Sequence, residues 1–251
     1  MIYITGDCHG EWDRFSVENF PEQREMTRDD FVIVCGDFGI WDNSPRERWW
    51  LDWFGKKNFT LLFCDGNHEN FDQLEGYEVV AFHGGRAHRL RENVYHLMRG
   101  YVFDLCGKSF FVFGGARSHD IQDGILEAGD FSSPAKMRAA FRRRRASGQK
   151  VRINHESWWA QEMPTRAEMD LGMDSLGAVE NQVDFVVTHC APQEIASLIL
   201  QEEREPDPLT QYFDTLAGRV SYSKWFFGHY HDNRSILGKY VLLYEQIIRI
   251  V

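Results

Sequence analysis

The sequence predicts an α/β fold in which two β-sheets pack against each other, with helices on the outside. In the first part of the chain, short apolar runs alternate with helix-like segments. Asp7, Asp37 and Asn67 each follow such a run and are spaced 30 residues apart, which is about the length of a strand–helix–strand unit. Residues 78–113 instead form short strand-like runs with turns between them, and this pattern indicates a second, more antiparallel sheet.

The composition is typical of a globular protein with a hydrophobic core. Of the 251 residues, 43% are hydrophobic and 26% are charged, and the formal net charge is −10. Such an acidic chain is not expected to bind nucleic acid in general, because phosphate contacts need a basic surface. The length fits one domain over residues 1–251, with a helical insertion at about 117–180.

We expect a cytoplasmic protein that does not enter the membrane. No apolar run approaches the length of a membrane span, and Met1 leads directly into a strand-like run without the features of a signal peptide. The five cysteines are odd in number and form no CxxC pair, as expected for reduced thiols. Four of them, which lie beside polar loops, are interpreted as small residues that fill strand ends, with metal ligation by sulfur as the alternative. These four are Cys8, Cys35, Cys64 and Cys190.

The first three strand-like runs cover residues 2–5, 31–35 and 59–64. Runs this apolar and this short are typical of strands buried on both faces. If the three strands are parallel, the loops that follow them meet at one edge of the sheet, where open α/β sheets bind ligands. Between the first two strands we expect a helix that begins near Glu11 and carries Trp12.

A second helix is predicted to begin at Ser44-Pro45. Ser44 can cap the helix, Pro45 suits the first turn, and Glu47 has the capping-box spacing. Gly55 can end the helix. The three tryptophans of this segment, at positions 49, 50 and 53, are interpreted as core residues rather than as a binding platform.

The antiparallel part is predicted from four strand-like runs, at residues 79–82, 94–97, 101–105 and 110–113. The turn residues Cys106–Ser109, between the last two runs, predict a hairpin. We expect these four strands to build the second sheet.

Residues 114–182 are the least regular part of the chain and are interpreted as a helical insertion near the site. Ser133 is expected to begin a helix that contains the basic run Arg142–Arg145. Trp158-Trp159 is placed on a second helix, and Thr165 has the capping-box spacing for a third.

The remainder of the chain is predicted to return to the sheets. In chain order we expect a strand at 183–188, a helix at 192–200, an acidic loop at 201–208, a strand at 224–227, a hairpin at 236–244 and a final strand at 246–251. The two single strands end in His189 and Gly228-His229, respectively.

Five short loops hold polar side chains of the kind that bind transition metals. Each follows an apolar run, and together they offer two aspartates, one asparagine and four histidines as candidate metal ligands. This mixture of carboxylate, amide and imidazole groups suits Mn, Fe, Zn or Ni better than Ca or Mg. A single Asp-x-His loop or strand-end histidine is usually structural, but five such loops in one chain indicate a metal site. The side chains are Asp7, His9, Asp37, Asn67, His189, His229 and His231.

We interpret this set as a site for two divalent transition-metal ions, with manganese as the first choice and iron, zinc or nickel as alternatives. A carboxylate can span two ions, and Asp37, in the middle of the set, suits that role. Two such ions activate a water molecule near neutral pH and hold the oxygens of a phosphoryl group. The set therefore points to hydrolysis of a phosphate ester.

The same five loops match, in order, the signature blocks of a known family. The blocks GDxHG, GDxxG, GNHE, a strand that ends in His, and GHxH read here as GDCHG, GDFG, GNHE, VVTHC and GHYH, from Gly6 to His231. In these blocks the chain resembles the calcineurin-like metallophosphoesterases, and in particular the small bacterial phosphoesterases of that superfamily. The resemblance implies a two-sheet αββα sandwich of the metallophosphoesterase type and a dinuclear metal site.

The resemblance also implies roles for individual residues. His68, the neighbour of Asn67, matches the family histidine that contacts phosphate or protonates the leaving group. We therefore expect His68 and Asp37 to be catalytic, and His68 and Asn67 to contact the substrate. One metal would be held by Asp7, His9, Asp37 and His231, and the other by Asp37, Asn67, His189 and His229.

One block departs from the pattern of the protein phosphatases in this family. Those enzymes continue the second block as GDxxDRG, in which the second Asp orients the catalytic histidine and the Arg holds phosphate. Residues Gly36–Asp42 read GDFGIWD and have neither residue at that place. Arg117, in a loop that leaves a predicted strand, is the candidate for a phosphate-binding arginine, with a plain surface arginine as the alternative.

The sequence thus predicts a metal-dependent phosphoric ester hydrolase that acts on a small or nucleotide-like phosphate mono- or diester. A Ser/Thr-type protein phosphatase is one alternative, disfavoured by the missing Asp-Arg pair. A nuclease is another, supported only by the Arg142–Arg145 run. A catalytically silent binding protein on the same fold is the third, although all seven ligand positions are filled.

Overall fold

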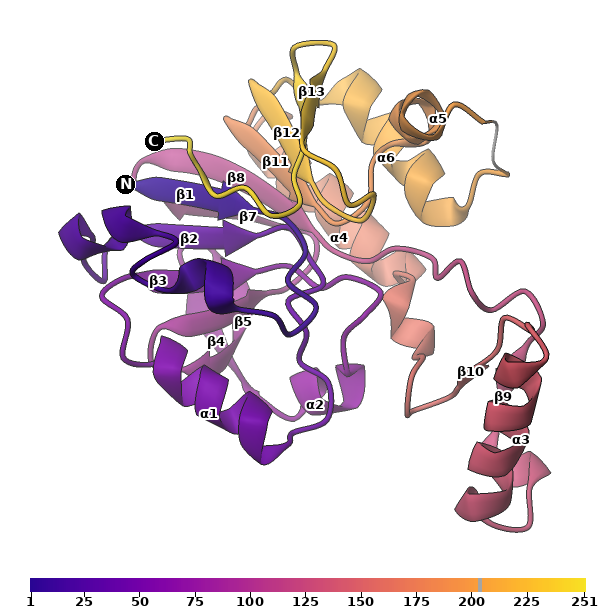
Figure 1. Ribbon diagram of the computed structural model, residues 1–251. Coiled ribbons are helices and arrows are strands. Elements are labelled where there is room, and N and C mark those ends of the chain that lie inside the picture. Colours follow the sequence, from indigo (N-terminus) through magenta and orange to yellow (C-terminus); the bar gives the residue numbers. More distant parts are fainter. Residues whose placement is uncertain (203–204) are drawn as a thin grey trace.

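The computed structural model describes residues 1–202 and 205–251 and consists mainly of two β-sheets packed face to face (Figure 1). The first sheet contains, in spatial order, β15 (Ile248–Arg249), β1 (Ile2–Thr5), β2 (Phe31–Val34), β3 (Thr60–Phe63), β6 (Val94–Leu97), β5 (Gly85–Arg91) and β4 (Glu78–Phe82). The second contains β13 (Arg234–Ile236), β14 (Tyr240–Leu242), β12 (Lys224–Phe227), β11 (Phe185–Thr188), β8 (Lys108–Phe113) and β7 (Tyr101–Leu105).

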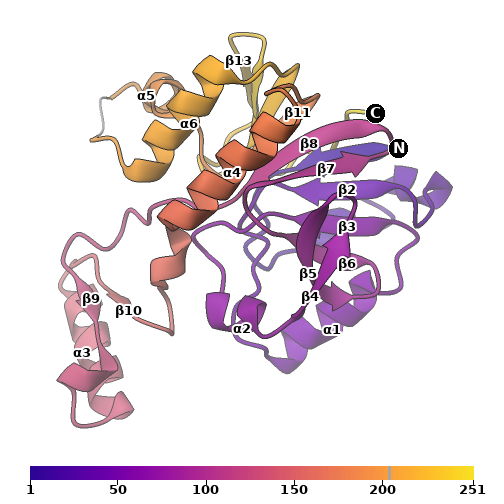
Figure 2. The same ribbon diagram turned by 180° about the vertical axis from the view of Figure 1, so that it is seen from behind.

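Helices cover the outer faces of both sheets (Figures 1 and 2). The first sheet is covered by α1 (Pro45–Phe54) and α2 (Phe71–Glu75), and the second by α4 (Arg166–Ala178), α5 (Gln193–Leu200) and α6 (Pro208–Arg219). The αββα sandwich that the sequence predicts is therefore confirmed.

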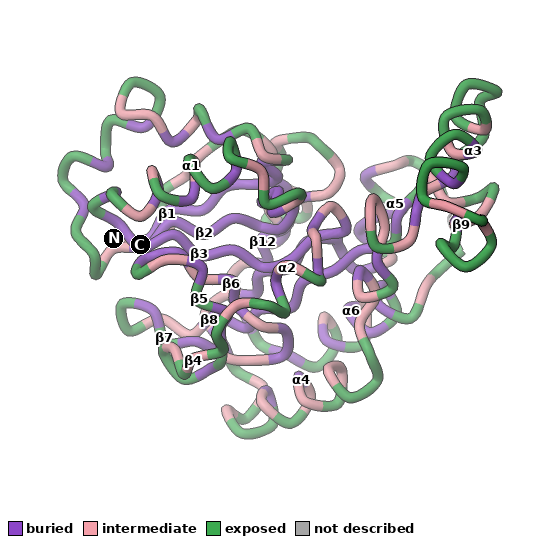
Figure 3. The backbone as a smooth tube through the Cα atoms, turned by 90° about the horizontal axis from the view of Figure 1, so that it is seen from below, coloured by how far each residue is buried: buried purple, intermediate pink, exposed green. Residues whose placement is uncertain are grey.

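Apolar side chains fill both the space between the two sheets and the space between each sheet and its helices, because successive side chains of a strand point to opposite faces. In β2, Ile33 lies in the same buried cluster as Val112 of β8, between the two sheets. Its neighbour Val34 lies in the cluster that includes Phe54 of α1, on the outer face. In β8, Phe111 joins the cluster formed with α4, α5 and α6. The central strands are thus apolar on both faces, and Figure 3 shows by its colours that they are buried.

Parallel pairing brings the polar loops to one edge of the molecule. In the first sheet, Thr5 of β1 is opposite Val34 of β2, and Val34 is opposite Phe63 of β3. In the second sheet, β11 is parallel to both β8 and β12. The strands that precede the predicted ligands therefore end level with one another within each sheet.

The strands between residues 78 and 97 lie in the first sheet, so their assignment to the second sheet is wrong. β6 pairs in parallel with β3, and β5 pairs antiparallel with both β6 and β4. β5 itself is an additional strand that the sequence did not reveal, because the exposed side chains of Arg86 and Arg89 interrupt the apolar pattern. Of the predicted group, only β7 and β8 build the second sheet, joined by the expected hairpin.

The predicted helix near Glu11 is also wrong. The segment forms two short 3₁₀ helices, η1 (Asp13–Phe15) and η2 (Pro21–Glu25). Its aromatic residues are nevertheless buried. The Gln23 side chain holds the turn, because its amide donates to the carbonyls of Phe15, Ser16 and Phe20.

The helix α1 begins as predicted, and the Ser44 side chain accepts a hydrogen bond from the backbone N–H of Glu47. The tryptophans on this helix differ from the expectation. Trp49 is 59% exposed, and Trp50 and Trp53 are only partly buried. The core face of α1 is instead provided by Leu51 and Phe54.

Residues 120–158, called the arm below, project away from the sandwich (Figures 1 and 2). The arm contains β9 (Ile125–Leu126), η3 (Ala128–Asp130), α3 (Pro134–Ala146) and β10 (Arg152–Ile153). It has its own small core of Leu126, Met137 and Ile153. Most of α3 is exposed, as Figure 3 shows. The predicted single domain with an insertion at about 117–180 remains a prediction.

Trp158-Trp159 does not lie on an α-helix, contrary to the prediction. The pair leads into the 3₁₀ helix η4 (Ala160–Glu162). Trp159 is 1% exposed, and its indole N–H donates to the Asp72 carboxylate at 2.7 Å. Trp159 thus attaches the end of the arm to α2. The following helix α4 starts with the predicted capping box of Thr165 and Glu168.

The C-terminal part contains a helix that the sequence did not predict. α6 begins after Asp207, whose carboxylate accepts from the backbone N–H groups of Leu209 and Thr210. The acidic loop expected at 201–208 includes residues 203–204, which lie outside the described residues. Over the described ranges, no helix combines the length and apolar character needed to span a bilayer.

Candidate metal centre

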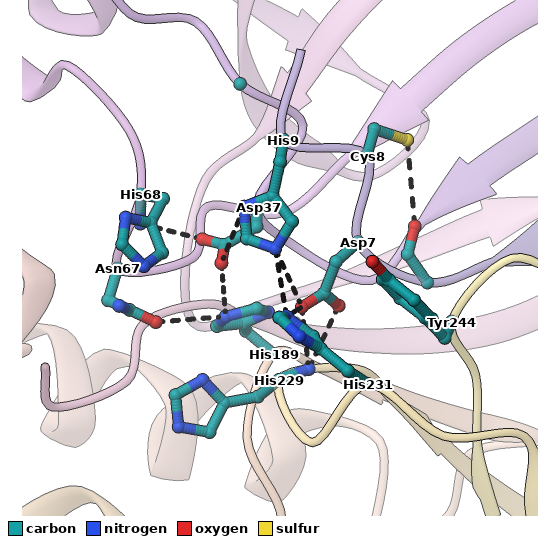
Figure 4. A network of polar contacts seen from close by, with 12 residues as sticks. Asp7, Cys8, His9, Asp37, Asn67, His68, His189, His229, His231 and Tyr244 are labelled. Carbon is teal, nitrogen blue, oxygen red and sulfur yellow. Dashed lines mark hydrogen bonds and ion pairs between the residues drawn. The ribbon is translucent and has the colours of Figure 1, made fainter. Parts of the chain in front are cut away.

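The five predicted polar loops come together at the C-terminal ends of β1, β2, β3, β11 and β12 (Figure 4). The deepest side chains are almost inaccessible: Asp7 and His189 are 0% exposed and Asp37 is 1% exposed. His9 and His231 lie at the rim, with 29% and 49% of their side chains exposed. The result is a recessed pair of carboxylates surrounded by imidazole rings.

Two glycines of the loops are required by close approach. A Cβ atom on Gly66 would lie 2.0 Å from Asp37 Oδ1, and one on Gly228 would lie 1.9 Å from Asp7 Oδ1. Any larger residue at either position would displace a buried carboxylate. These two glycines of the GNHE and GHYH loops therefore act by leaving room for the aspartates.

Four of the predicted ligands have left-handed backbone conformations. The φ angles are 50° for His9, 47° for Asp37, 69° for His229 and 48° for His231. Such conformations cost non-glycine residues about 1 kcal/mol or more and persist where the surrounding structure holds them. These conformations occur in the tight loops that follow β1, β2 and β12.

The first group of close ligand atoms comes from Asp7, His9 and His231, which lie within 4.8 Å of one another. His231 Nε2 is 3.2 Å and His9 Nε2 is 3.6 Å from Asp7 Oδ2. The two ring nitrogens are 2.9 Å apart. Asp7 is held from behind, because its carboxylate accepts the backbone N–H of His229 at 2.9 Å.

The second group comes from Asp7, Asp37 and His189. His189 Nε2 lies 3.4 Å from Asp37 Oδ2 and 3.2 Å from Asn67 Oδ1. His189 Nδ1 is 2.8 Å from the carbonyl oxygen of Cys35. A hydrogen bond from Nδ1–H to that carbonyl leaves Nε2 directed at the carboxylates, the usual arrangement of a metal-binding histidine.

Asn67 is oriented by a chain of polar contacts from the segment after β8. Its Nδ2 group donates to Ser118 Oγ at 3.3 Å. Ser118 donates in turn to the Glu162 carboxylate through Oγ at 2.6 Å and through its backbone N–H at 2.9 Å. Asn67 Oδ1 therefore faces His189. Sequence reasoning missed Ser118 and Glu162, since nothing local in the sequence connects them to Asn67.

His229 is placed differently from the other predicted ligands. Its ring lies beside that of His189, with centroids 5.0 Å apart, but it belongs to neither group of close ligand atoms. Its Nε2 instead lies 3.0 Å from Nε2 of His119. The sequence did not single out His119, whose only signal is its place in the loop after β8.

The electrostatic environment favours a positive charge between the carboxylates. Burial opposes ionisation of Asp37, but His189 and His68 lower its pKa below the usual range. Burial alone would lower the pKa of His189. The carboxylates of Asp37 and Asp7 outweigh this effect and raise the pKa of His189 to about 10. The same field favours a divalent cation. The buried oxygens and imidazole nitrogens therefore fit the transition-metal site that the sequence predicts.

The pKa of His229 is shifted in the opposite direction from that of His189. Burial, followed by the neighbouring His189 and His119 rings, lowers the pKa of His229 well below its usual value. Its imidazole is therefore neutral and keeps one nitrogen lone pair for a partner.

Glu69, the last residue of the GNHE loop, is 0% exposed and holds the Asp37 loop in place. Its carboxylate accepts backbone N–H groups from Phe38 at 2.6 Å, from Gly39 at 3.2 Å and from Ile40 at 2.9 Å. Glu69 therefore positions Asp37 without facing the cluster itself. The sequence block contains this residue, but its role becomes apparent only in the folded chain.

The other predicted substrate residues lie around the cluster. The His68 backbone N–H donates to Asp37 Oδ1 at 2.7 Å, and its ring lies 5.3 Å from that of His9 and 6.1 Å from that of Trp41. Arg117 is exposed and lines a separate cavity of about 600 Å³ that also reaches His229. Arg142–Arg145 lie on α3 in the arm.

The cysteines beside the loops are buried thiols. Burial raises the pKa of Cys8 to about 12, and it also raises the pKa of Cys35, Cys64 and Cys190 well above the usual value. No cysteine belongs to a group of close ligand atoms in the part of the chain that the structure describes. This supports their interpretation as small residues at strand ends.

A comparison with protein families agrees with this geometry. The family model described as calcineurin-like phosphoesterase matches residues 1–233. No curated protein matches the chain.

Proposed function

The chain belongs to the calcineurin-like phosphoesterases, a family of metal-dependent phosphate ester hydrolases, and we propose that it is a dinuclear enzyme of this kind. We propose as its substrate a small or nucleotide-like phosphate mono- or diester. The observation that carries the proposal is a pair of overlapping groups of close ligand atoms: one comes from Asp7, His9 and His231, and the other from Asp7, Asp37 and His189. The three residues of the second group are buried, and each follows a different strand.

The proposed ligand sets extend the two groups and give Asp37 the bridging role. Asp37 suits this role because its Oδ2 lies 3.7 Å from His9 Nδ1 and 3.4 Å from His189 Nε2. When bound, the divalent ions supply an activated water molecule and neutralise charge on the phosphoryl oxygens. One ion would be held by Asp7, His9, Asp37 and His231, and the other by Asp37, Asn67, His189 and His229.

We assign substrate contact to His68 and Arg117. The backbone of His68 is fixed by Asp37, so its ring is directed to the cavity mouth beside His9. From there it can donate an N–H to a phosphoryl or leaving-group oxygen. Arg117 is exposed and lines the second cavity, which also reaches His229. Its guanidinium can hold two phosphate oxygens at once.

The Ser/Thr protein phosphatase alternative has less support. At the place where those enzymes have Asp and Arg, this chain has Ile40 and Trp41. Ile40 is buried, and Trp41 lines the cavity beside His68. Neither side chain can hold a phosphate group by charge.

The experiment that tests the proposal combines metal content with a substrate panel. Chelated protein is reconstituted with Mn²⁺, analysed for bound metal, and assayed on p-nitrophenyl phosphate, bis-p-nitrophenyl phosphate, nucleotides, cyclic nucleotides and a phosphopeptide. We expect two ions per chain and hydrolysis that chelation abolishes. One ion or none would contradict the dinuclear assignment, and preference for the phosphopeptide would favour a protein phosphatase.

A further inference from the structure

A cavity of about 320 Å³ opens directly beside His68. Aromatic rings form much of its wall, from His9, Trp12, Trp41 and His68. The volume is within the range of sites that bind small molecules. The cavity is thus connected both to a predicted metal ligand, His9, and to the residue proposed to contact the ester.

The position of this cavity identifies the part of the substrate that it receives. In the proposed reaction the phosphoryl group lies over the ligand clusters, and the departing alcohol lies next to His68. The alcohol must then extend to the side of His68 that faces away from the clusters. The 320 Å³ cavity occupies this side, since His68 and His9 form its boundary with the metal centre.

The tryptophan walls are held in place by bonds within the protein. The backbone N–H of Trp41 donates to Glu47 at 2.6 Å, and its carbonyl accepts from Asn70 at 2.8 Å. The edge of Trp159 packs against the Trp41 ring, with centroids 5.7 Å apart. The indole N–H of Trp12 donates to the carbonyl of Phe38 at 2.9 Å. The Trp41 ring is therefore a flat apolar surface that is fixed before any ligand arrives, and Trp12, which is 2% exposed, supports the wall from below the surface.

Arg46 is the polar group of this cavity with most capacity to bind a ligand. Glu47 is already used by the backbone of Trp41 and Asp42, and Ser44 caps α1. Arg46 is exposed, and its guanidinium donates a long hydrogen bond of 3.5 Å to the carbonyl of Gly10. Its remaining N–H groups can donate to acceptor atoms of a ligand.

We propose that this cavity binds the nucleoside part of a nucleotide ester, with the base stacked on Trp41 and bonded by Arg46. A heteroaromatic base suits both features, because it has a flat face and acceptor atoms at its edge. The proposal rests on the proposed hydrolase function and narrows its substrate to nucleotides whose nucleoside is the leaving group.

Two esters that differ only by the base provide the activity test. AMP and ribose 5-phosphate both release a primary alcohol, so leaving-group acidity does not separate them. We expect kcat/KM to favour AMP, and Trp41→Ala to reduce the ratio of the two kcat/KM values about tenfold, the usual effect of losing one base–aromatic contact. Trp41→Phe should retain most of the ratio. A wild-type ratio near one, or a ratio that Trp41→Ala does not change, would overturn the proposal.

Trp49→Ala is the matched control. Trp49 lies on α1, is 59% exposed and does not line the cavity, so the ratio should stay at the wild-type value. Thermal unfolding of each variant checks that Trp41→Ala still folds, since Trp41 also packs against Trp159. If Trp41→Ala does not fold, Trp41→Leu takes its place.

Binding of adenosine, measured by calorimetry, tests the cavity without any turnover. We expect the wild-type protein and Trp49→Ala to bind adenosine, and Trp41→Ala to bind it about tenfold more weakly. Adenosine binding without hydrolysis of any ester would contradict the proposed function and leave the cavity assignment intact. Hydrolysis of both esters at equal rates without adenosine binding would contradict the cavity assignment alone.

A second inference comes from the contact between His119 and His229. Their Nε2 atoms are 3.0 Å apart, and a hydrogen bond at this distance needs one N–H and one lone pair. If His229 donates, its Nδ1 lone pair is available to a metal ion. If His119 donates, the Nε2 lone pair of His229 accepts that bond and the ring N–H of His229 is on Nδ1, so that nitrogen cannot bind a metal.

We infer that His119 is a positioning residue that accepts the Nε2–H of His229 and so presents Nδ1 to the second metal. Ring N–H groups of metal-binding histidines generally have such a partner. The backbone of His229 is already fixed by Asp7. The contact with His119 therefore determines what is left open, which is the rotation of the His229 ring and its tautomer. This inference depends on a contact that the nucleoside cavity does not share.

Metal titration of chelated protein, followed by calorimetry, tests this role independently of activity. We expect His119→Ala to weaken the second Mn²⁺ binding event about 10–100-fold and to leave the first nearly unchanged. His119→Gln should restore much of the affinity, because its amide oxygen can accept the same hydrogen bond. His155→Ala is the control, since His155 is exposed and bonds to Asp72 in α2. Wild-type affinity in His119→Ala, or equal losses in the Ala and Gln variants, would overturn the inference.

Discussion

Asp37 occupies the centre of the site because of its backbone as well as its charge. Its φ angle is 47°, and its Oδ1 accepts the backbone N–H of His68 at 2.7 Å. Its Oδ2 lies 3.4 Å from His189 Nε2 and 3.7 Å from His9 Nδ1. One carboxylate therefore faces ring nitrogens from both proposed ligand sets.

Asp37→Asn keeps the shape of this side chain and removes its charge. We expect the variant to lose both metal ions, with affinities reduced by more than about 100-fold, because even a lost outer partner costs about 10–100-fold. Elemental analysis after Mn²⁺ reconstitution measures the change. Asp42→Asn, at an exposed position in the following loop, should bind metal normally. Two tightly bound ions in Asp37→Asn would exclude a bridging role.

His68→Ala separates chemistry from metal binding. We expect metal content to stay near the wild-type value while kcat falls by about 10²–10⁴, the usual contribution of a general acid. The loss should be smaller for p-nitrophenyl esters, whose leaving group needs little protonation. Equal losses for good and poor leaving groups would show that His68 binds phosphate and does not protonate the leaving group.

At the scale of elements, the loop that follows β8 connects the metal centre to the arm. Ser118 bonds to Asn67, and His119 lies against His229. Asp120 pairs with Arg152 of β10 at 2.8 Å. The loop is thus attached to both the ligand cluster and the arm, and Arg117 extends from it into the 600 Å³ cavity.

Arg117→Ala tests whether this loop contributes to phosphate binding. We expect KM for a phosphate ester to rise or kcat to fall by about tenfold, because one charge-assisted contact is worth about 1.5–3 kcal/mol, while bound metal is unchanged. Steady-state kinetics with Mn-loaded enzyme gives the answer. If the variant is kinetically silent with every substrate, the phosphate-binding role of Arg117 is wrong.

The arginines of α3 in the arm provide a comparison with Arg117, because they are not expected to bind small phosphate esters. Arg142 and Arg143 are exposed on α3, in a projecting part of the molecule (Figure 2). Replacement of Arg142–Arg145 by glutamine should leave activity on small esters within about twofold, since surface charges of this kind are screened by salt. Loss of activity on oligonucleotides alone would favour the nuclease alternative.

At the scale of the molecule, a buried ion cluster connects segments that are far apart in the sequence. Asp65, two residues before Asn67, is 1% exposed. It accepts hydrogen bonds from Arg99 Nε at 2.9 Å and lies 3.1 Å from His96 Nε2. Arg99 also donates to the carbonyl of Gln161, next to the end of the arm. The cluster therefore ties β3, the β6–β7 connection and η4 together.

This cluster predicts a specific dependence of stability on pH. Burial opposes ionisation of Asp65, but Arg99 and then His96 lower its pKa below the usual value. Because the folded-state pKa lies below the unfolded one, the stabilisation is complete above about pH 4 and is lost as the pH falls further. Asp65→Asn should reduce the slope of unfolding free energy against pH in that acidic range.

At neutral pH the same variant should lower the unfolding free energy by about 3–5 kcal/mol, because Arg99 stays buried without its partner. Urea unfolding in the presence of a chelator measures both effects without a contribution from metal release. Asp170→Asn is a suitable control, since Asp170 pairs with Arg166 at an exposed position on α4. An unchanged slope in Asp65→Asn would mean that other carboxylates dominate the acid response.

The sequence by itself determined the features that are local in the chain. The apolar runs, the helix start at Ser44 and the strand-end loops with Asp, Asn and His depend on residues within a few positions of one another, so pattern alone indicates them. The regular spacing of Asp7, Asp37 and Asn67 also indicated that β1, β2 and β3 are parallel. Connections of similar length separate β1 from β2 and β2 from β3.

Only the tertiary structure decided the features that depend on distant partners. An alternating strand pattern does not specify its neighbour, so the sequence could not assign β4, β5 and β6 to the first sheet. The partners Ser118 and His119 lie 51 and 110 positions away from Asn67 and His229. The exposure of Trp49 and the cavity beside Trp41 likewise depend on how α1 and the arm pack. Contacts of this kind form only when the whole chain is folded, and no local pattern encodes them.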